Sequence, residues 1–177
     1  VHGSKSSKSA ILNFQMPTAN ELQKEVDKEN KALKDDLKES MKDAKDLKNK
    51  MQEMQDKLLD KKNLNWEDKK NITDAMSKQK ELQKQLEEIK NKFNQNIEKQ
   101  NDFKELSESV KEKQQKLQEL FNNTMNDEMK KLFEKLEKML DDLQKKDTLK
   151  KMEDMKANNE KIEKELDRML ELFKKLE

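Results

Sequence analysis

The 177-residue chain has no cysteine and no tyrosine, and it has only one histidine, one glycine and one proline. Without cysteine there is no thiolate metal site or disulfide, and the sequence does not indicate a redox compartment. A phosphate-binding loop needs several glycines, whereas Gly3 is the only one. Because His2 is the only histidine, the chain lacks a nucleophile–base pair and a Glu-x-x-His di-iron motif. We therefore expect no catalytic residue, no cofactor and no metal, and hence no enzyme.

Long apolar runs and an excess of one charge are also absent. No stretch approaches the ~20 apolar residues that a membrane-spanning helix requires. Forty Lys and Arg residues against 39 Asp and Glu leave a net charge of +1. Nucleic-acid binding needs a clustered positive excess, and charge-driven disorder needs strong self-repulsion. The composition therefore predicts a folded protein that has no nucleic-acid partner, and no membrane span in this part of the sequence.

The sequence does contain an apolar stripe at heptad spacing, although 45% of its residues are charged. Apolar residues three and four positions apart occupy one face of a helix, and a long stripe of this kind is typical of coiled coils. Acid-first pairs four residues apart, such as Glu88 with Lys92, support the outer faces by only ~0.2–0.5 kcal/mol each. The stripe therefore predicts an all-α fold.

Helix-start signals predict where the long helices begin. Thr18 and Glu21 form a capping box, in which each side chain can bind the other residue's backbone N–H. Just before Asn65 the apolar stripe loses phase, and asparagine is a favoured N-cap. We therefore expect an elongated antiparallel hairpin of two helices, at about 18–62 and 66–122. In the second helix the nearly apolar-free stretch Asn94–Asn101 is either a hinge or an ordinary polar layer.

The flanking regions differ from the predicted hairpin, which we assign to residues 18–122. Residues 1–17 form a polar linker and a short extended segment, which is either the closing strand of a preceding domain or a tail along the helices. Residues 123–177 have a broader apolar stripe and predict a C-terminal helical bundle, whose last helix is capped by Asn158 or Asn159. We interpret the chain as an internal piece of a longer protein.

Four residues are candidates for interaction with a partner. Trp66, the only tryptophan, is either a docking anchor or a plug over the end of the hairpin. Arg168, the only arginine, either clamps an acid such as Glu165 or reflects codon usage. Leu136 and Phe173 belong to an apolar stripe that is too wide for one neighbouring helix, so part of it should remain exposed as a partner surface.

The runs LNWEDKK (64–70), KELQKQ (80–85) and EKELDRMLELFKKLE (163–177) resemble those of a family of very large cell-envelope proteins of Bacteroidota. Members have transmembrane helices near the N-terminus, followed by a long extracytoplasmic coiled-coil region of unknown function. The resemblance implies a periplasmic location, with cytoplasmic as the alternative, and a membrane anchor outside this piece. It supplies no catalytic residue.

Together these features predict a structural or interaction module. It would serve as a coiled-coil spacer or docking platform of a membrane-anchored envelope protein, and its partners would be other envelope proteins. One alternative is a parallel homo-oligomeric coiled coil. Another is an amphipathic module that binds a lipid surface, although its polar face carries acids as densely as bases.

Overall fold

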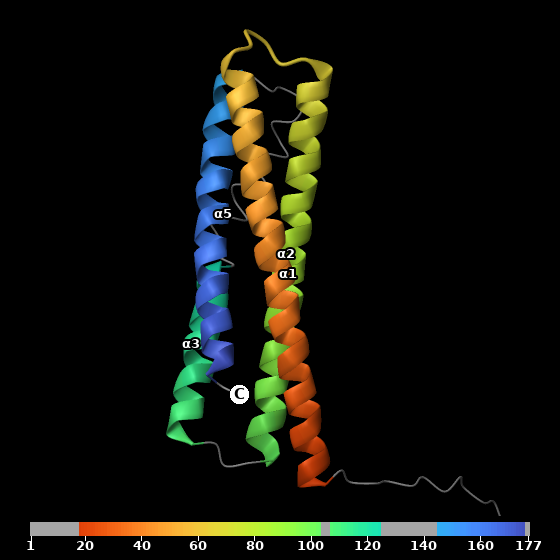
Figure 1. Ribbon diagram of the computed structural model, residues 1–177, viewed down its shortest axis with the longest axis vertical. Coiled ribbons are helices and arrows are strands. Elements are labelled where there is room, and N and C mark those ends of the chain that lie inside the picture. The colour runs from red at the N-terminus through yellow and green to blue at the C-terminus, as the bar shows by residue number, and fades with distance from the viewer. Residues whose placement is uncertain (1–17, 104–106, 125–144, 176–177) are drawn as a thin grey trace, which may run out of the picture.

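The computed structural model describes residues 18–103, 107–124 and 145–175. These residues form four helices and no strand, and the helices pack side by side as an elongated bundle (Figure 1). The helices are α1 (Ala19–Leu59), α2 (Trp66–Phe103), α3 (Glu108–Thr124) and α5 (Lys145–Lys174). The predicted all-α class is confirmed. The predicted N-terminal extended segment lies outside the described residues.

The capping box that begins α1 is present. The Thr18 hydroxyl accepts a hydrogen bond from the Glu21 N–H at 3.3 Å, and the Thr18 N–H donates to the Glu21 carboxylate at 2.8 Å. These bonds satisfy backbone donors that a helix start would otherwise leave unpaired. From this cap α1 continues for 41 residues, or roughly 60 Å at ~1.5 Å per residue.

A second cap reverses the chain after α1. The Asp68 N–H donates to the Asn65 side-chain oxygen at 2.8 Å, and the Asn65 N–H donates to the Asp68 carboxylate at 3.0 Å. The predicted N-cap at Asn65 and the reversal before it are therefore confirmed. The end of the bundle formed by residues 59–66 is called the tip below.

Helices α1 and α2 pack antiparallel, as predicted. Lys92 on α2 pairs with Asp36 on α1 at 2.9 Å, whereas Lys99, further along α2, pairs with the earlier residue Glu25 at 3.1 Å. Because the α1 partner moves backward as α2 advances, the two helices run in opposite directions.

The predicted length of the second helix is wrong. Helix α2 ends at Phe103, and α3 begins at Glu108 and runs back along α2. Lys90 donates to Asn122 at 2.7 Å, and Gln114 donates to Gln100 at 3.2 Å, which is an antiparallel pairing. The polar side chains on the facing sides of α2 and α3 explain this reversal. In one continuous helix they would be buried without partners, whereas they bind one another when α3 folds back.

The stretch Asn94–Asn101 is fully helical and carries a polar layer. Asn96, only 1% exposed, donates to Glu29 of α1 at 2.8 Å and accepts a hydrogen bond from Gln100. Gln100 in turn accepts the bond from Gln114 of α3. This layer therefore links three helices through one chain of hydrogen bonds.

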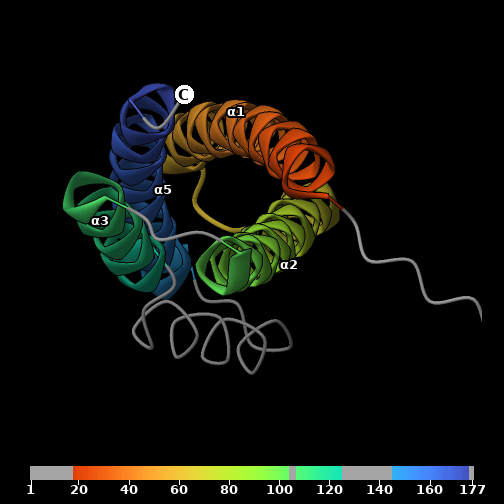
Figure 2. The ribbon, with the colours of Figure 1, turned by 90° about the horizontal axis from the view of Figure 1, so that it is seen from below.

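Helix α5 folds back onto the hairpin and runs antiparallel to α1. Lys48 of α1 pairs with Glu163 of α5 at 2.7 Å. The predicted helix start at Asn158 or Asn159 is wrong, because α5 is continuous from Lys145. Asn159 is instead fully buried in the bundle, where its amide binds Gln79 and does not cap a helix. Seen along the bundle, α1, α2 and α5 surround a common axis, and α3 lies against α5 and α2 (Figure 2).

The core is divided into two apolar clusters. The tip cluster consists of Leu47, Met51, Leu58, Ile72, Ala75, Met76, Met152 and Met155. The base cluster is rich in leucine, isoleucine and phenylalanine and takes residues from all four helices, so residues before and after position 123 share it. Between the clusters the Asn159 amide donates to the Gln79 side-chain oxygen at 2.7 Å. Both of these polar side chains are at most 1% exposed.

Candidate docking surfaces

Trp66 lies at the tip and points into solvent. It is the first residue of α2 and is 76% exposed, and Leu59, the last residue of α1 before the turn, is 60% exposed. The Lys70 ammonium lies 5.5 Å from the centre of the indole ring, within range of a cation–π contact. Trp66 therefore does not plug the end of the hairpin. Leu58 and Leu64 cover the apolar seam there, as members of the tip cluster or packed against it.

Asp68 links several parts of the tip turn through its carboxylate. Besides its contact with the Asn65 N–H, its carboxylate pairs with the Lys61 ammonium at 2.6 Å. The Lys61 hydrogen bond, together with that from Asn65, holds the pKa of Asp68 below its ordinary value although burial opposes the shift. The exposed Trp66 side chain therefore projects from an ordered turn that is stabilised at neutral pH.

Arg168 makes an ion pair that the sequence suggested. Its guanidinium donates to the Glu165 carboxylate at 3.0 Å, one turn earlier on α5. The arginine side chain is 66% exposed and the glutamate side chain 11% exposed, so the guanidinium caps a buried carboxylate at the bundle surface. Exposed ion pairs contribute little to stability.

Phe173 does not belong to an exposed surface. It is 2% exposed, and its ring centre lies 5.6 Å from that of Phe93, which in turn lies 5.4 Å from that of Phe121. The predicted interaction role of Phe173 is wrong because α2, α3 and α5 together enclose it. Leu136, the other candidate from the same stripe, lies outside the described residues.

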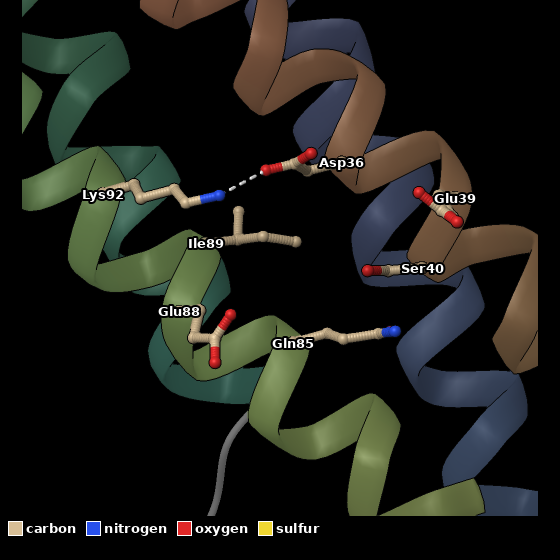
Figure 3. Close-up of a pocket in the computed structure, with 7 residues that line it drawn as sticks. All are labelled: Asp36, Glu39, Ser40, Gln85, Glu88, Ile89 and Lys92. Carbon is tan, nitrogen blue, oxygen red and sulfur yellow. Dashed lines mark hydrogen bonds and ion pairs between the residues drawn. The ribbon is translucent and has the colours of Figure 1, made fainter.

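Sequence reasoning missed a groove between α1 and α2. It consists of two adjoining hollows, of about 570 Å³ and about 160 Å³, and Gln85 lines both. In the smaller hollow the ion pair between Asp36 and Lys92 closes one end, and Gln85 extends from α2 toward α1 near Ser40 (Figure 3). The Gln85 side-chain oxygen is buried and has no hydrogen-bond partner in the structure.

The groove is acidic as a whole, and its net negative charge lies on the α1 wall. Seven carboxylates and three lysines line the two hollows, which leaves a net charge of −4 there against +1 for the whole chain. Glu39 and Glu88 line the smaller hollow from opposite helices (Figure 3), and Asp46 and Glu81 line the larger one. The acids beside the seam are visible in the sequence, but only the helix register shows that they face one groove.

The described residues contain no group of three histidines or acids that could hold a metal ion. None of the described helices has a stretch both long and apolar enough to cross a bilayer. No protein-family model, curated protein or solved structure matches the chain. Its function must therefore be inferred from the surfaces described above.

Proposed function

We propose that this chain is a structural and interaction module, a helical spacer with a docking surface at its tip. The observation that carries the proposal is the exposure of Trp66, at 76%, and of Leu59, at 60%, at the two ends of a hydrogen-bonded turn at the end of a long bundle. These are the only large apolar side chains exposed to this extent in the described part of the chain.

Two properties of the tip favour partner binding: a large apolar surface that a partner can remove from water, and a turn that is ordered before binding. A tryptophan can bury ~150–250 Å² against a partner, and tryptophan is among the residues that most often dominate binding energy at protein interfaces. The Asn65–Asp68 cap and the Lys61–Asp68 ion pair order the turn before binding. Less conformational entropy is then lost when the partner binds.

The antiparallel contacts also favour a spacer made of a single chain. Ion pairs between α1 and α2 and between α1 and α5 are formed within one chain. A parallel homo-oligomer would have to replace them. The placement in the cell envelope, with a membrane anchor elsewhere in a longer protein, is part of the same proposal and rests on the sequence resemblance alone.

Site-specific photo-crosslinking in cells tests the tip. A benzophenone amino acid replaces Trp66 in one variant and exposed Lys164 of α5 in the control. We expect one dominant protein adduct from position 66 and none of that size from position 164, because among the residues that the structure describes only the tip has exposed large apolar side chains. The same adduct pattern from both positions would contradict the proposal. Adducts to lipid instead of protein would favour the lipid-surface alternative.

A further inference from the structure

The second surface with a specific chemistry is the groove between α1 and α2. Along α1 it extends from Asp36 to Glu53, or roughly 25 Å at ~1.5 Å per residue. Its floor is formed by the buried side chains of the seam, among them Leu47, Leu82 and Ile89. A groove of this length and shape between two packed helices matches the outer surface of a third helix.

The pattern of charged residues along the α1–α2 seam changes at the point where the groove begins. Toward the base of the bundle the flanking positions pair acid with base: Lys99 binds Glu25 at 3.1 Å and Glu29 at 2.5 Å, and Lys92 binds Asp36 at 2.9 Å. Beyond Asp36, no ion pair between described residues crosses from one wall to the other along the rest of the groove.

Instead, acids outnumber lysines by five to one on the α1 wall, and the α2 wall carries two of each. Glu39 on α1 and Glu88 on α2 share one hollow, and Asp46 on α1 and Glu81 on α2 share the other. Like charges at positions beside a helical seam destabilise the pairing, whereas opposite charges would support it. The arrangement costs stability in the isolated bundle, and cationic side chains placed between the walls would remove that cost.

We infer that the groove between α1 and α2 is a docking site for a basic amphipathic helix of a partner protein. Its apolar side chains would lie over the seam, and its lysines or arginines would contact the acids of both walls. This inference rests on the proposed function as an interaction module and adds the chemistry of a second partner site.

The chain's own segment 125–144 does not fit this charge requirement. By sequence it has six acids and four lysines, a net charge of −2, which matches the sign of the groove. A metal ion is also a poor occupant, because the described acids form no group of three at ligating distance. A cationic helix from another protein satisfies both the length and the charge of the groove.

Binding of designed peptides tests the inference. The probe is a fluorescent amphipathic helix of about 18 residues, roughly 27 Å long, with a Leu/Ala stripe flanked by lysines. The matched control peptide is the same helix with every lysine replaced by glutamate. By fluorescence anisotropy at low salt we expect the basic peptide to bind at least about tenfold more tightly than the acidic one, and to weaken as salt is added.

Two variants of the protein separate the groove from general electrostatic attraction. The groove variant carries Glu39→Lys, Asp46→Lys, Glu81→Lys and Glu88→Lys. The control variant carries the same number of charge reversals at exposed positions outside the groove: Asp74→Lys, Glu87→Lys, Glu153→Lys and Asp167→Lys. Circular dichroism checks that both variants fold. We expect the groove variant to reverse the preference and bind the acidic peptide, and the control variant to keep the preference of the wild type.

Several outcomes would overturn the inference. They are equal binding of the two peptides by the wild type, and equal loss of basic-peptide binding in both variants. A third is self-association of the chain through the groove, detected by light scattering and lost in the groove variant. Trp66 emission reports the tip separately, since it is the only tryptophan. Absence of a protein adduct at position 66, together with selective binding of the basic peptide, would therefore contradict the proposed function alone. A protein adduct at position 66 without selective peptide binding would contradict only the groove.

Discussion

At the scale of single residues, a charged side chain stabilises the fold most when it binds a backbone group as well as an opposite charge. Asp68 is the clearest case, because one of its carboxylate oxygens accepts the Asn65 N–H and the other pairs with Lys61. Exposed Asp35 also pairs with a lysine, Lys38, but on the open surface of α1. The Asp68 contacts tie the first turn of α2 to the loop that follows α1, whereas the Asp35–Lys38 pair stays within one helix.

The first prediction concerns the pH dependence of this contact. The pKa of Asp68 is lower in the folded state than its ordinary value. Its stabilising contribution is therefore present above about pH 4 and is lost as the pH falls through the lowered pKa. We expect Asp68→Asn to lower the free energy of unfolding by about 0.5–1 kcal/mol near neutral pH, and by less as the pH approaches ~3.

Urea denaturation of the two proteins at a series of pH values measures this difference. Glu67→Gln is the matched control, because Glu67 lies on the same helical turn and is exposed. A difference for Asp68→Asn that stays constant across the pH range would contradict the electrostatic explanation.

At the scale of helices, capping residues and buried amides act differently. Caps determine where α1 and α2 begin, and both could be predicted because Thr18 and Asn65 precede acids three residues later. The break after Phe103 could not be predicted from the stripe. Ser107 precedes α3 and its carbonyl accepts the N–H of Val110 at 3.0 Å, but Val110 is not the acid or amide that would complete a capping box.

The second prediction concerns the polar layer between the two core clusters. Asn159 and Gln79 share one hydrogen bond, and each leaves one buried polar atom unpaired in the structure. Replacing both residues by leucine removes these atoms together. We expect the double variant to be at least as stable as the wild type, and up to about 1–3 kcal/mol more stable.

The single variant Asn159→Leu is the control, since it leaves the buried Gln79 amide without its partner. We expect it to lower the free energy of unfolding by about 1–3 kcal/mol. Urea denaturation compares the three proteins. If the double variant were less stable than the wild type, the layer would contribute net stability and this prediction would be wrong.

At the scale of the whole molecule, α5 packs against the other helices and completes the core of the bundle. Helix α5 shares the base cluster with the other three helices and contacts α1 through Lys48 and Glu163. The bundle is therefore closed within one chain, and its exposed features are the tip and the acidic groove. A parallel homo-oligomer of the same sequence would instead bury the stripe between copies.

The third prediction distinguishes these two assemblies. A carbodiimide joins a lysine to a carboxylate only at contact distance, and Lys48 lies 2.7 Å from Glu163. In a mixture of unlabelled and nitrogen-15 protein, we expect the cross-linked peptides to be fully light or fully heavy, because both residues belong to one chain. Lys164→Arg, which removes an exposed lysine, should not change the yield. Mixed light–heavy peptides as a main product would show that the contact forms between chains.

The sequence by itself determined the helical class, the two capped helix starts, the reversal before Asn65 and the absence of the residues that common active sites use. These features depend on periodicity, on neighbours within a few positions and on composition, all of which are local. Only the tertiary structure decided that α3 folds back on α2, that Asn159 is buried, that Phe173 is enclosed and that Trp66 is exposed. Those outcomes depend on contacts between residues far apart in the chain, and in a lysine- and glutamate-rich sequence many pairings have nearly equal local energies.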